Sequence, residues 1–104
     1  GKTIRYRAPE TFERKFVQNF DSGVSGDIFS YGVLLLEMQT RKRPYDTCSD
    51  EYEVQKQIEN GDLEMIPVSC PPTYEGLIQG CRKIEPTERL SAEAVIAILE
   101  KYNP

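Results

Sequence analysis

The 104-residue sequence contains no histidine, and its three cysteines, Cys48, Cys70 and Cys81, are widely spaced. Zinc sites are built mainly from closely spaced cysteines and histidines, and a catalytic cysteine is usually activated by a histidine. Because the chain also has no Cys-x-x-Cys pair, these absences exclude both kinds of site within it. We expect the cysteines to be free thiols in a reducing compartment, which favours a cytoplasmic location.

Positive charge is scarce as well. The chain carries 13 Lys and Arg against 17 Asp and Glu, which gives a net charge of −4 at pH 7. Its basic residues cluster only at Arg41, Lys42 and Arg43, and a cluster of this kind is typical of a solvated helix end. The charge balance therefore argues against a nucleic acid as the main partner.

Residues 27–38 form the apolar stretch around which the rest of the chain is organised. Its apolar side chains point in nearly every direction on a helical wheel, which is typical of a buried helix. A buried strand is the alternative, because short apolar runs are ambiguous by periodicity alone. The length of the run and the presence of Glu37 and Met38 favour a helix, with Asp27 near its N-cap after turn residues 21–26. The run is too short to span a bilayer, so no membrane insertion is expected.

Capping and turn residues predict shorter helices on either side of this stretch. Residues 10–16 could form a helical turn. Asp50 and Glu53 match a capping box, and the helix that they open is expected to run to about residue 60, before Gly61. Its predicted apolar face is formed by Tyr52, Val54 and Ile58.

Two more helices are expected near the end of the chain. Thr73 would cap the first, which ends before Pro86, and Ser91 would cap the second, over residues 92–101. The predicted core residues are Leu77, Ile78 and Cys81 in the first and Val95, Ile96, Ile98 and Leu99 in the second. The sequence thus predicts an all-α domain with a central buried helix and three or more helices packed around it.

This central helix looks oversized for its surroundings, since only 38% of the chain is hydrophobic. We therefore expect the 104 residues to be a piece of a larger protein, an interpretation with which the start at Gly1, without an initiator Met, agrees. Leu34 to Leu36 are expected to form an exposed apolar patch, which invites association.

Residue types alone give no catalytic constellation, because the chain has no Gly-rich loop and no Ser beside a base. Two charged residues lie in apolar settings, Glu10 in Tyr-Arg-Ala-Pro-Glu and Arg89 in Pro-Thr-Glu-Arg-Leu. A buried carboxylate and a buried guanidinium could pair in bidentate fashion. Taken one at a time, each is more simply read as an exposed charge.

Four motifs in order resemble the protein kinases. Thr3-Ile-Arg-Tyr-Arg-Ala-Pro-Glu10 resembles the end of a kinase activation segment, which contains Ala-Pro-Glu. The other three are Asp27-Ile-Phe-Ser-Tyr-Gly32, similar to Asp-x-Trp-Ser-x-Gly; the helix exit from Leu36 through Arg43-Pro-Tyr45; and Cys70-Pro-Pro72 through Cys81 to Glu85-Pro-Thr-Glu-Arg89. The chain departs from the family pattern at Lys2, Phe29, Arg82 and Glu85. The resemblance spans nearly the whole chain.

The resemblance implies that residues 1–104 form a partial kinase domain, from the end of the activation segment through the last C-lobe helices. It implies a buried Glu10–Arg89 ion pair and an Asp27 that holds the backbone of the catalytic loop. It also implies that Thr3 lines the substrate loop, which leans toward Ser/Thr specificity of the tyrosine-kinase-like group, and that Tyr6 packs beneath this loop. Protein substrates are the expected partners.

The parts of a kinase that bind ATP and Mg²⁺ are absent from these 104 residues. The Gly-rich loop, the ATP-anchoring lysine, His-Arg-Asp and Asp-Phe-Gly all precede the span that the resemblance covers. We therefore expect ATP and Mg²⁺ to serve the complete domain, whose N-terminal part would be a further partner, and not to bind this chain alone. A pseudokinase or docking lobe, in which the helix after Asp50 and residues 67–72 bind proteins, and an unrelated helical module are the alternatives.

Overall fold

A computed structural model describes residues 4–12 and 20–102, with side chains from residue 24 onward in the second range. These residues contain four α-helices: α1 (Phe20–Thr40), α2 (Glu51–Glu59), α3 (Pro72–Cys81) and α4 (Ala92–Tyr102). Three short 3₁₀ turns accompany them: η1 (Ile4–Tyr6), η2 (Pro9–Phe12) and η3 (Pro86–Glu88). The described residues form no β-strand, so the all-α prediction is confirmed.

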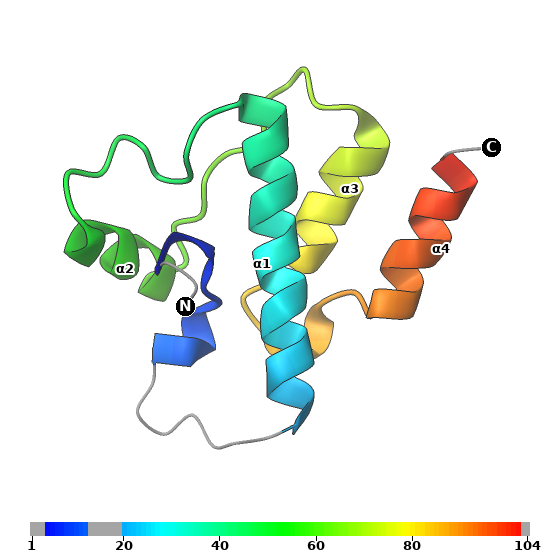
Figure 1. Cartoon of the computed structure of the whole chain (residues 1–104), viewed down its shortest axis with the longest axis horizontal. Helices are drawn as coiled ribbons and strands as arrows, with labels where there is room; N and C mark the ends of the chain where they lie inside the picture. Colours follow the sequence, from blue (N-terminus) through cyan, green and yellow to red (C-terminus); the bar gives the residue numbers. More distant parts are fainter. Residues whose placement is uncertain (1–3, 13–19, 103–104) are drawn as a thin grey trace.

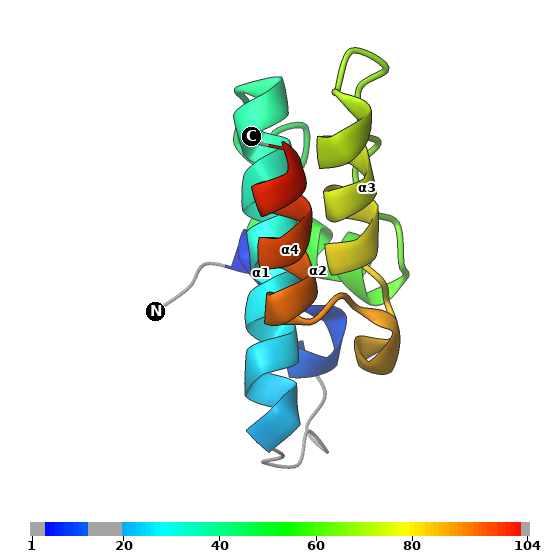
Figure 2. The ribbon, with the colours of Figure 1, turned by 90° about the vertical axis from the view of Figure 1, so that its right-hand side faces the viewer.

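The long helix α1 is the axis of the molecule. Figure 1 shows α3 and α4 on one side of it, and α2 with the 4–12 segment on the other. Figure 2, turned by 90°, shows α4 in front of α1 with α3 beside it. Two separate contact surfaces on α1 therefore organise the chain.

The largest core cluster lies between α1 and α3. It joins Leu35 and Leu36 of α1 to Leu77, Ile78 and Cys81 of α3, all of them buried, so the predicted stripe on α3 is confirmed. The two helices approach closely at Gly32, where a Cβ atom would lie 2.8 Å from the Cβ of Cys81. A smaller cluster packs Ala8 against Phe29 and Val33 on the other side of α1.

The beginning of α1 differs from the prediction. Helix α1 starts at Phe20, so Asp27 lies well inside the helix and the prediction of an N-cap at this residue was wrong. Helix propensity is a weak preference that tertiary contacts override. Ser25 shows the reason: its hydroxyl and its carbonyl both accept hydrogen bonds from Arg89, so this hydroxyl serves a tertiary contact rather than a turn.

The caps of α2 follow the sequence closely. The Glu53 amide donates to Asp50 Oδ1 at 2.9 Å, which confirms Asp50 as N-cap. The Glu53 carboxylate accepts from the amide of Ser49, one residue before the expected position. Gly61 has φ of +78° at the end of the helix, as predicted, in a region that glycine enters without strain. Tyr52, however, is 68% exposed, since it lies two residues before buried Val54 and therefore on the opposite side of the helix.

Helices α3 and α4 correct two further details. Helix α3 begins at Pro72, whose ring fixes φ in the helical range, and not after a Thr73 cap. In α4 the Ser91 hydroxyl accepts from the Ala94 amide, which confirms that cap. Val95 is buried as predicted, but Ile96 is 55% exposed and lies beside an open groove rather than in the core.

The exposed apolar surface also differs from the prediction. Leu35 and Leu36 are buried by α3, and Leu34 is 45% exposed. An apolar groove of about 400 Å³ runs between α1 and α4, lined by Val24, Asp27, Ile28, Tyr31, Ala92, Val95, Ile96 and Leu99. The groove between α1 and α4 is therefore an exposed apolar surface that the sequence did not predict.

Candidate functional site

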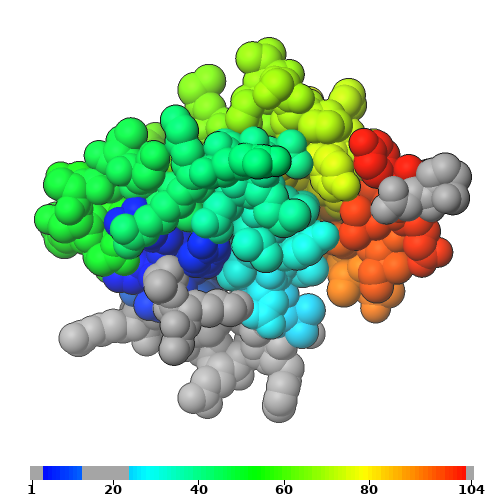
Figure 3. Space-filling view, turned by 45° about the horizontal axis from the view of Figure 1, so that its top comes forward, coloured from blue at the N-terminus to red at the C-terminus, as the bar shows by residue number. Residues whose placement is uncertain are grey.

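The candidate site is the 4–12 segment together with the side chains that anchor it. The segment lies between α1 and α2, as Figure 3 shows by the blue atoms between the green and cyan ones. Ala8 in its middle is 1% exposed and packs against Phe29 and Val33 of α1. Its two 3₁₀ turns leave most backbone polar groups without a helical partner, so side chains must hold it in place.

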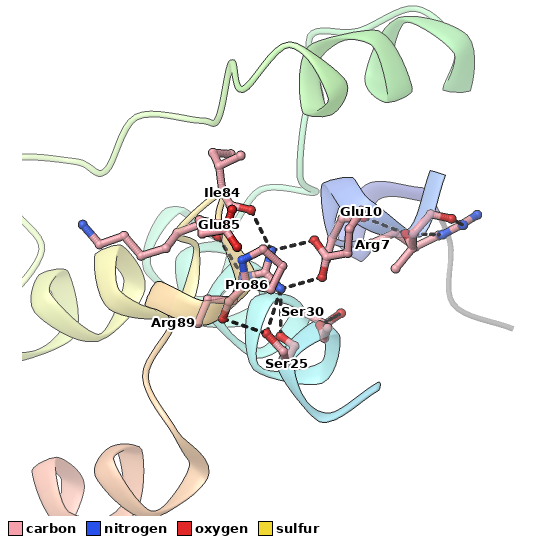
Figure 4. Close-up of polar contacts among 12 residues, drawn as sticks. Arg7, Glu10, Ser25, Ser30, Ile84, Glu85, Pro86 and Arg89 are labelled. Carbon is pink, nitrogen blue, oxygen red and sulfur yellow. Dashed lines mark hydrogen bonds and ion pairs between the residues drawn. The ribbon is translucent and has the colours of Figure 1, made fainter. Parts of the chain in front are cut away.

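Glu10 and Arg89, 79 residues apart, form the main anchor (Figure 4). Arg89 Nη1 donates to Glu10 Oε2 and Arg89 Nη2 donates to Glu10 Oε1, both at 2.7 Å, which is a bidentate ion pair. The Arg89 side chain is 1% exposed and that of Glu10 is 14% exposed. The structure thus brings together the two charges that sequence analysis singled out.

Every other donor of the Arg89 guanidinium also meets an acceptor. Nε donates to the Lys83 carbonyl at 2.8 Å and Nη2 to the Ile84 carbonyl at 3.2 Å. Nη1 reaches the carbonyl and the hydroxyl of Ser25 at 3.1 and 3.2 Å. The guanidinium carbon lies 4.9 Å from the centre of the Phe29 ring. One side chain therefore joins the 4–12 segment, α1 and the loop after α3.

Tyr6 anchors the segment to the middle and the C-terminal part of α1. Its hydroxyl donates to Glu37 Oε1 at 2.5 Å, and its carbonyl accepts from the Ser30 hydroxyl at 2.7 Å. The hydrogen bond to the Glu37 carboxylate, followed by burial, raises the pKa of the Tyr6 hydroxyl above its ordinary value. Tyr6 is therefore held as a neutral donor against α1.

Arg5 anchors the same segment toward α2, and sequence analysis missed it. Its Nη1 donates to the carbonyls of Pro44 and Tyr45 at 2.7 and 2.8 Å, and its Nη2 lies 2.8 Å from Glu51 Oε1. The side chain is 5% exposed. Arg7 is only half-buried and bonds locally to Thr11, and no feature of the sequence distinguishes the two arginines.

The remaining predicted site residues have different settings. Asp27 has an exposed side chain on α1 and borders the apolar groove. A smaller hollow of about 230 Å³ is lined by Asp27 together with Tyr6, Ser30, Tyr31 and Leu34. Thr3 lies outside the described residues. The structure thus brings Arg89 into contact with the segment that carries Tyr6 and Glu10. Asp27, by contrast, has an exposed side chain on α1.

A second polar group lies inside the molecule and was also not foreseen. Arg82 is 8% exposed and donates from Nη1 to the Glu64 carbonyl at 2.9 Å. Burial lowers the pKa of Arg82, and burial raises the pKa of the neighbouring Glu64 carboxyl. Burial likewise raises the pKa of Tyr45 to about 12. The Arg82 bond to the Glu64 carbonyl thus ties the loop after α2 to the end of α3, whereas burial disfavours the charged form of the Glu64 carboxyl.

Among the described side chains, no group of three His, Cys, Asp or Glu residues is placed to hold a metal ion. Within the described part of the chain, no helix combines the length and apolar character needed to cross a bilayer.

Comparison with known proteins identifies the type of domain. The sequence profile of the family described as protein tyrosine and serine/threonine kinase matches residues 2–99. The chain is 29% identical over 97 residues to Mitogen-activated protein kinase kinase kinase 7 of Drosophila melanogaster, covering 92% of this chain and 13% of that protein. It is 34% identical over 100 residues to Ephrin type-A receptor 7 of Gallus gallus, covering 94% of this chain and 9% of that protein.

A third relative is Serine/threonine/tyrosine-protein kinase HT1 of Arabidopsis thaliana, which is 28% identical over 101 residues. That match covers 97% of this chain and 25% of the relative. The chain therefore spans about a quarter or less of the length of these three relatives. By their names, one of these relatives is a serine/threonine/tyrosine-protein kinase and another is a receptor.

Proposed function

The chain belongs to the protein tyrosine and serine/threonine kinase family, and we propose that it is the substrate-side part of a kinase C-lobe. Residues 1–104 would run from the end of the activation segment through the last C-lobe helices. The complete domain would transfer the γ-phosphate of ATP, with Mg²⁺, to Ser or Thr of cytoplasmic protein substrates. Nucleic acids and membrane insertion have no part in this proposal.

The bidentate Glu10–Arg89 pair is the observation that supports this proposal best. It fixes the 4–12 segment against α1 from the loop after α3, with all donors of Arg89 bonded. A segment that receives a protein substrate must hold one shape while the substrate binds, because loose positioning of the reacting groups lowers the rate. Glu10 and Arg89 therefore have structural roles.

The other residues of the proposal lie around this anchor. Tyr6 supports the segment from α1 through Glu37, and together with Thr3 it would contact the substrate. Asp27, exposed on α1, would hold the backbone of the catalytic loop in the complete domain. Phosphoryl transfer depends mainly on positioning and on electrostatic stabilisation, so such supporting residues contribute without touching the transferred group.

The decisive experiment compares nucleotide binding and phosphoryl transfer by the full-length protein that carries this chain with the same measurements on the 104 residues. We expect activity in the first and none in the second. Phosphoamino-acid analysis of the product would test Ser/Thr specificity, and phosphotyrosine alone would contradict it. Absence of both nucleotide binding and transfer by the full-length protein would refute the proposal.

A pseudokinase or docking lobe is the second candidate. The surface around α2 supports it, because Tyr52 is 68% exposed, Met65 is 90% exposed and Val68 is fully exposed. Exposed aromatic and apolar side chains of this kind are typical of protein-interaction surfaces. Under this alternative the protein would bind partners through α2 and the loop after it, without phosphoryl transfer.

A further inference from the structure

Helix α2 packs mainly on the 4–12 segment and not on the other helices. Its principal element contacts are with η1 and η2. Its buried residues Val54 and Ile58 form a cluster with Tyr45, against which Ile4 and Phe12 pack. Figure 3 shows the same arrangement from outside, with the blue segment against the green α2 region. A movement of α2 would therefore displace the 4–12 segment before it displaces the other helices.

Arg5 is the charged link in this interface. It carries a buried positive charge whose ion-pair partner is Glu51, the first residue of α2. The same guanidinium binds the carbonyls of Pro44 and Tyr45 in the loop that leads to α2. Tyr45 has φ of +56°, a strained conformation for a residue other than glycine. Arg5 thus holds both the start of α2 and the strained turn before it.

Neighbouring residues of the segment are held from opposite sides. Tyr6 bonds to Glu37 on α1, whereas Arg5 bonds to Glu51 on α2. The position of the segment between the two helices therefore depends on both contacts. Among the described residues, loss of the Arg5 contact would leave only the apolar packing of Ile4 and Phe12 to hold the segment against α2.

We infer that Arg5 is a positioning residue that couples α2 to the substrate segment through Glu51. This inference rests on the proposed function, because it assigns a role in substrate binding. Glu51 is 45% exposed and also lies 3.7 Å from Arg43, so the link can be reached from the surface. A partner protein that shifts the start of α2 would alter substrate affinity through this contact.

Amide hydrogen exchange tests the coupling without any need for catalysis. In the full-length protein, Glu51→Gln and Arg5→Lys should each speed exchange of the Arg7 amide, which donates to the Ile4 carbonyl at 3.1 Å. We expect about a fivefold increase, which is the upper end of what the loss of a partly exposed ion pair produces. Glu59→Gln, an exposed change at the other end of α2, is the matched control and should leave this amide unchanged.

The choice of variants separates coupling from a change within α2. Glu51→Gln also removes a carboxylate from the helix N-terminus, where negative charge is favourable. Arg5→Lys leaves α2 intact, but its compact ammonium cannot reproduce the bonds of a planar guanidinium. Unchanged exchange at Arg7 in both variants would overturn the inference, whatever the activity of the protein.

Steady-state kinetics then test the positioning role. We expect the KM for a protein substrate to rise about fivefold in both variants. The KM for ATP and kcat should stay nearly unchanged, because the lost contact would bind the substrate equally in its ground state and its transition state. Faster exchange with an unaltered protein-substrate KM would overturn the positioning role. A full-length protein that transfers no phosphate refutes the proposed function instead, and in that case the exchange result alone decides the coupling.

Discussion

Replacing Arg89 with alanine would remove all the hydrogen bonds of its guanidinium at once. Glu10, 14% exposed, would keep its negative charge with no cation in contact among the described residues, and the Lys83 and Ile84 carbonyls would lose their donor. Truncating one member of a buried ion pair costs about 3–5 kcal/mol, because the remaining charge stays buried. Since water partly reaches Glu10, we expect a loss near the lower end, about 3 kcal/mol.

A loss of this size is easily measured by thermal unfolding. In a domain of about 100 residues, 1 kcal/mol corresponds to about 4–8 °C, so Arg89→Ala should lower Tm by about 12 °C or more. Urea unfolding of the same variants gives the free energy of unfolding independently. If Arg89→Ala is too unstable to purify, Arg89→Lys keeps the charge and should show a smaller loss of the same sign.

Arg43→Ala is the matched control for this prediction. Arg43 is 65% exposed and lies 3.7 Å from a carboxylate, and an exposed pair of this kind contributes about 0–1 kcal/mol. A double-mutant cycle with Glu10→Gln isolates the coupling of Glu10 to Arg89. The reasoning would be refuted by an Arg89→Ala protein that unfolds at the same temperature as Arg43→Ala.

Other residues give independent tests. Gly32→Ala should cost about 1–3 kcal/mol of unfolding free energy in urea, because the new Cβ would lie 2.8 Å from that of Cys81. Asp50→Ala should cost about 1 kcal/mol in the same assay, since it removes the N-cap bond to Glu53. Under native conditions at pH 8, iodoacetamide should modify partly exposed Cys48 before Cys81, whose pKa burial raises to about 11, and mass spectrometry would reveal a reversed order. Burial raises the pKa of Glu64 in the folded chain, so its contribution to stability is largest below its unfolded pKa and is lost as pH rises through the folded value. Glu64→Gln should therefore be more stable than the natural chain at pH 7, and urea unfolding should show this difference narrowing toward pH 4.

Local signals predicted the shorter helices well. Asp50, Ser91 and Gly61 each act on backbone groups within a few residues, so their effect can be read without knowledge of the rest of the fold. The apolar stripe of α3 was also predicted correctly, because residues three and four apart share one face of a helix. These features depend only on neighbouring residues.

Two predictions failed because distant contacts decide the structure. The polar residues around Ser25 suggested a turn, but their groups serve Arg89 and the helix continues through them. Leu35 and Leu36 were expected at the surface because the burial supplied by α3 could not be weighed from the sequence. In each case a contact between segments far apart in the chain outweighed the local preference.

The three arginines that are buried in the described part of the chain show why the site could be predicted only in part. Arg5, Arg82 and Arg89 each donate to carbonyls of irregular segments, which have no helical donor of their own. A guanidinium is suited to this task because it offers five donors in a fixed plane. Which arginine binds such carbonyls depends on where the fold places them. The residues that flank an arginine in the sequence do not show this. The Arg89 role was foreseen because a motif marks its position, whereas Arg5 and Arg7 look equivalent in sequence and differ only in which loop lies beside them.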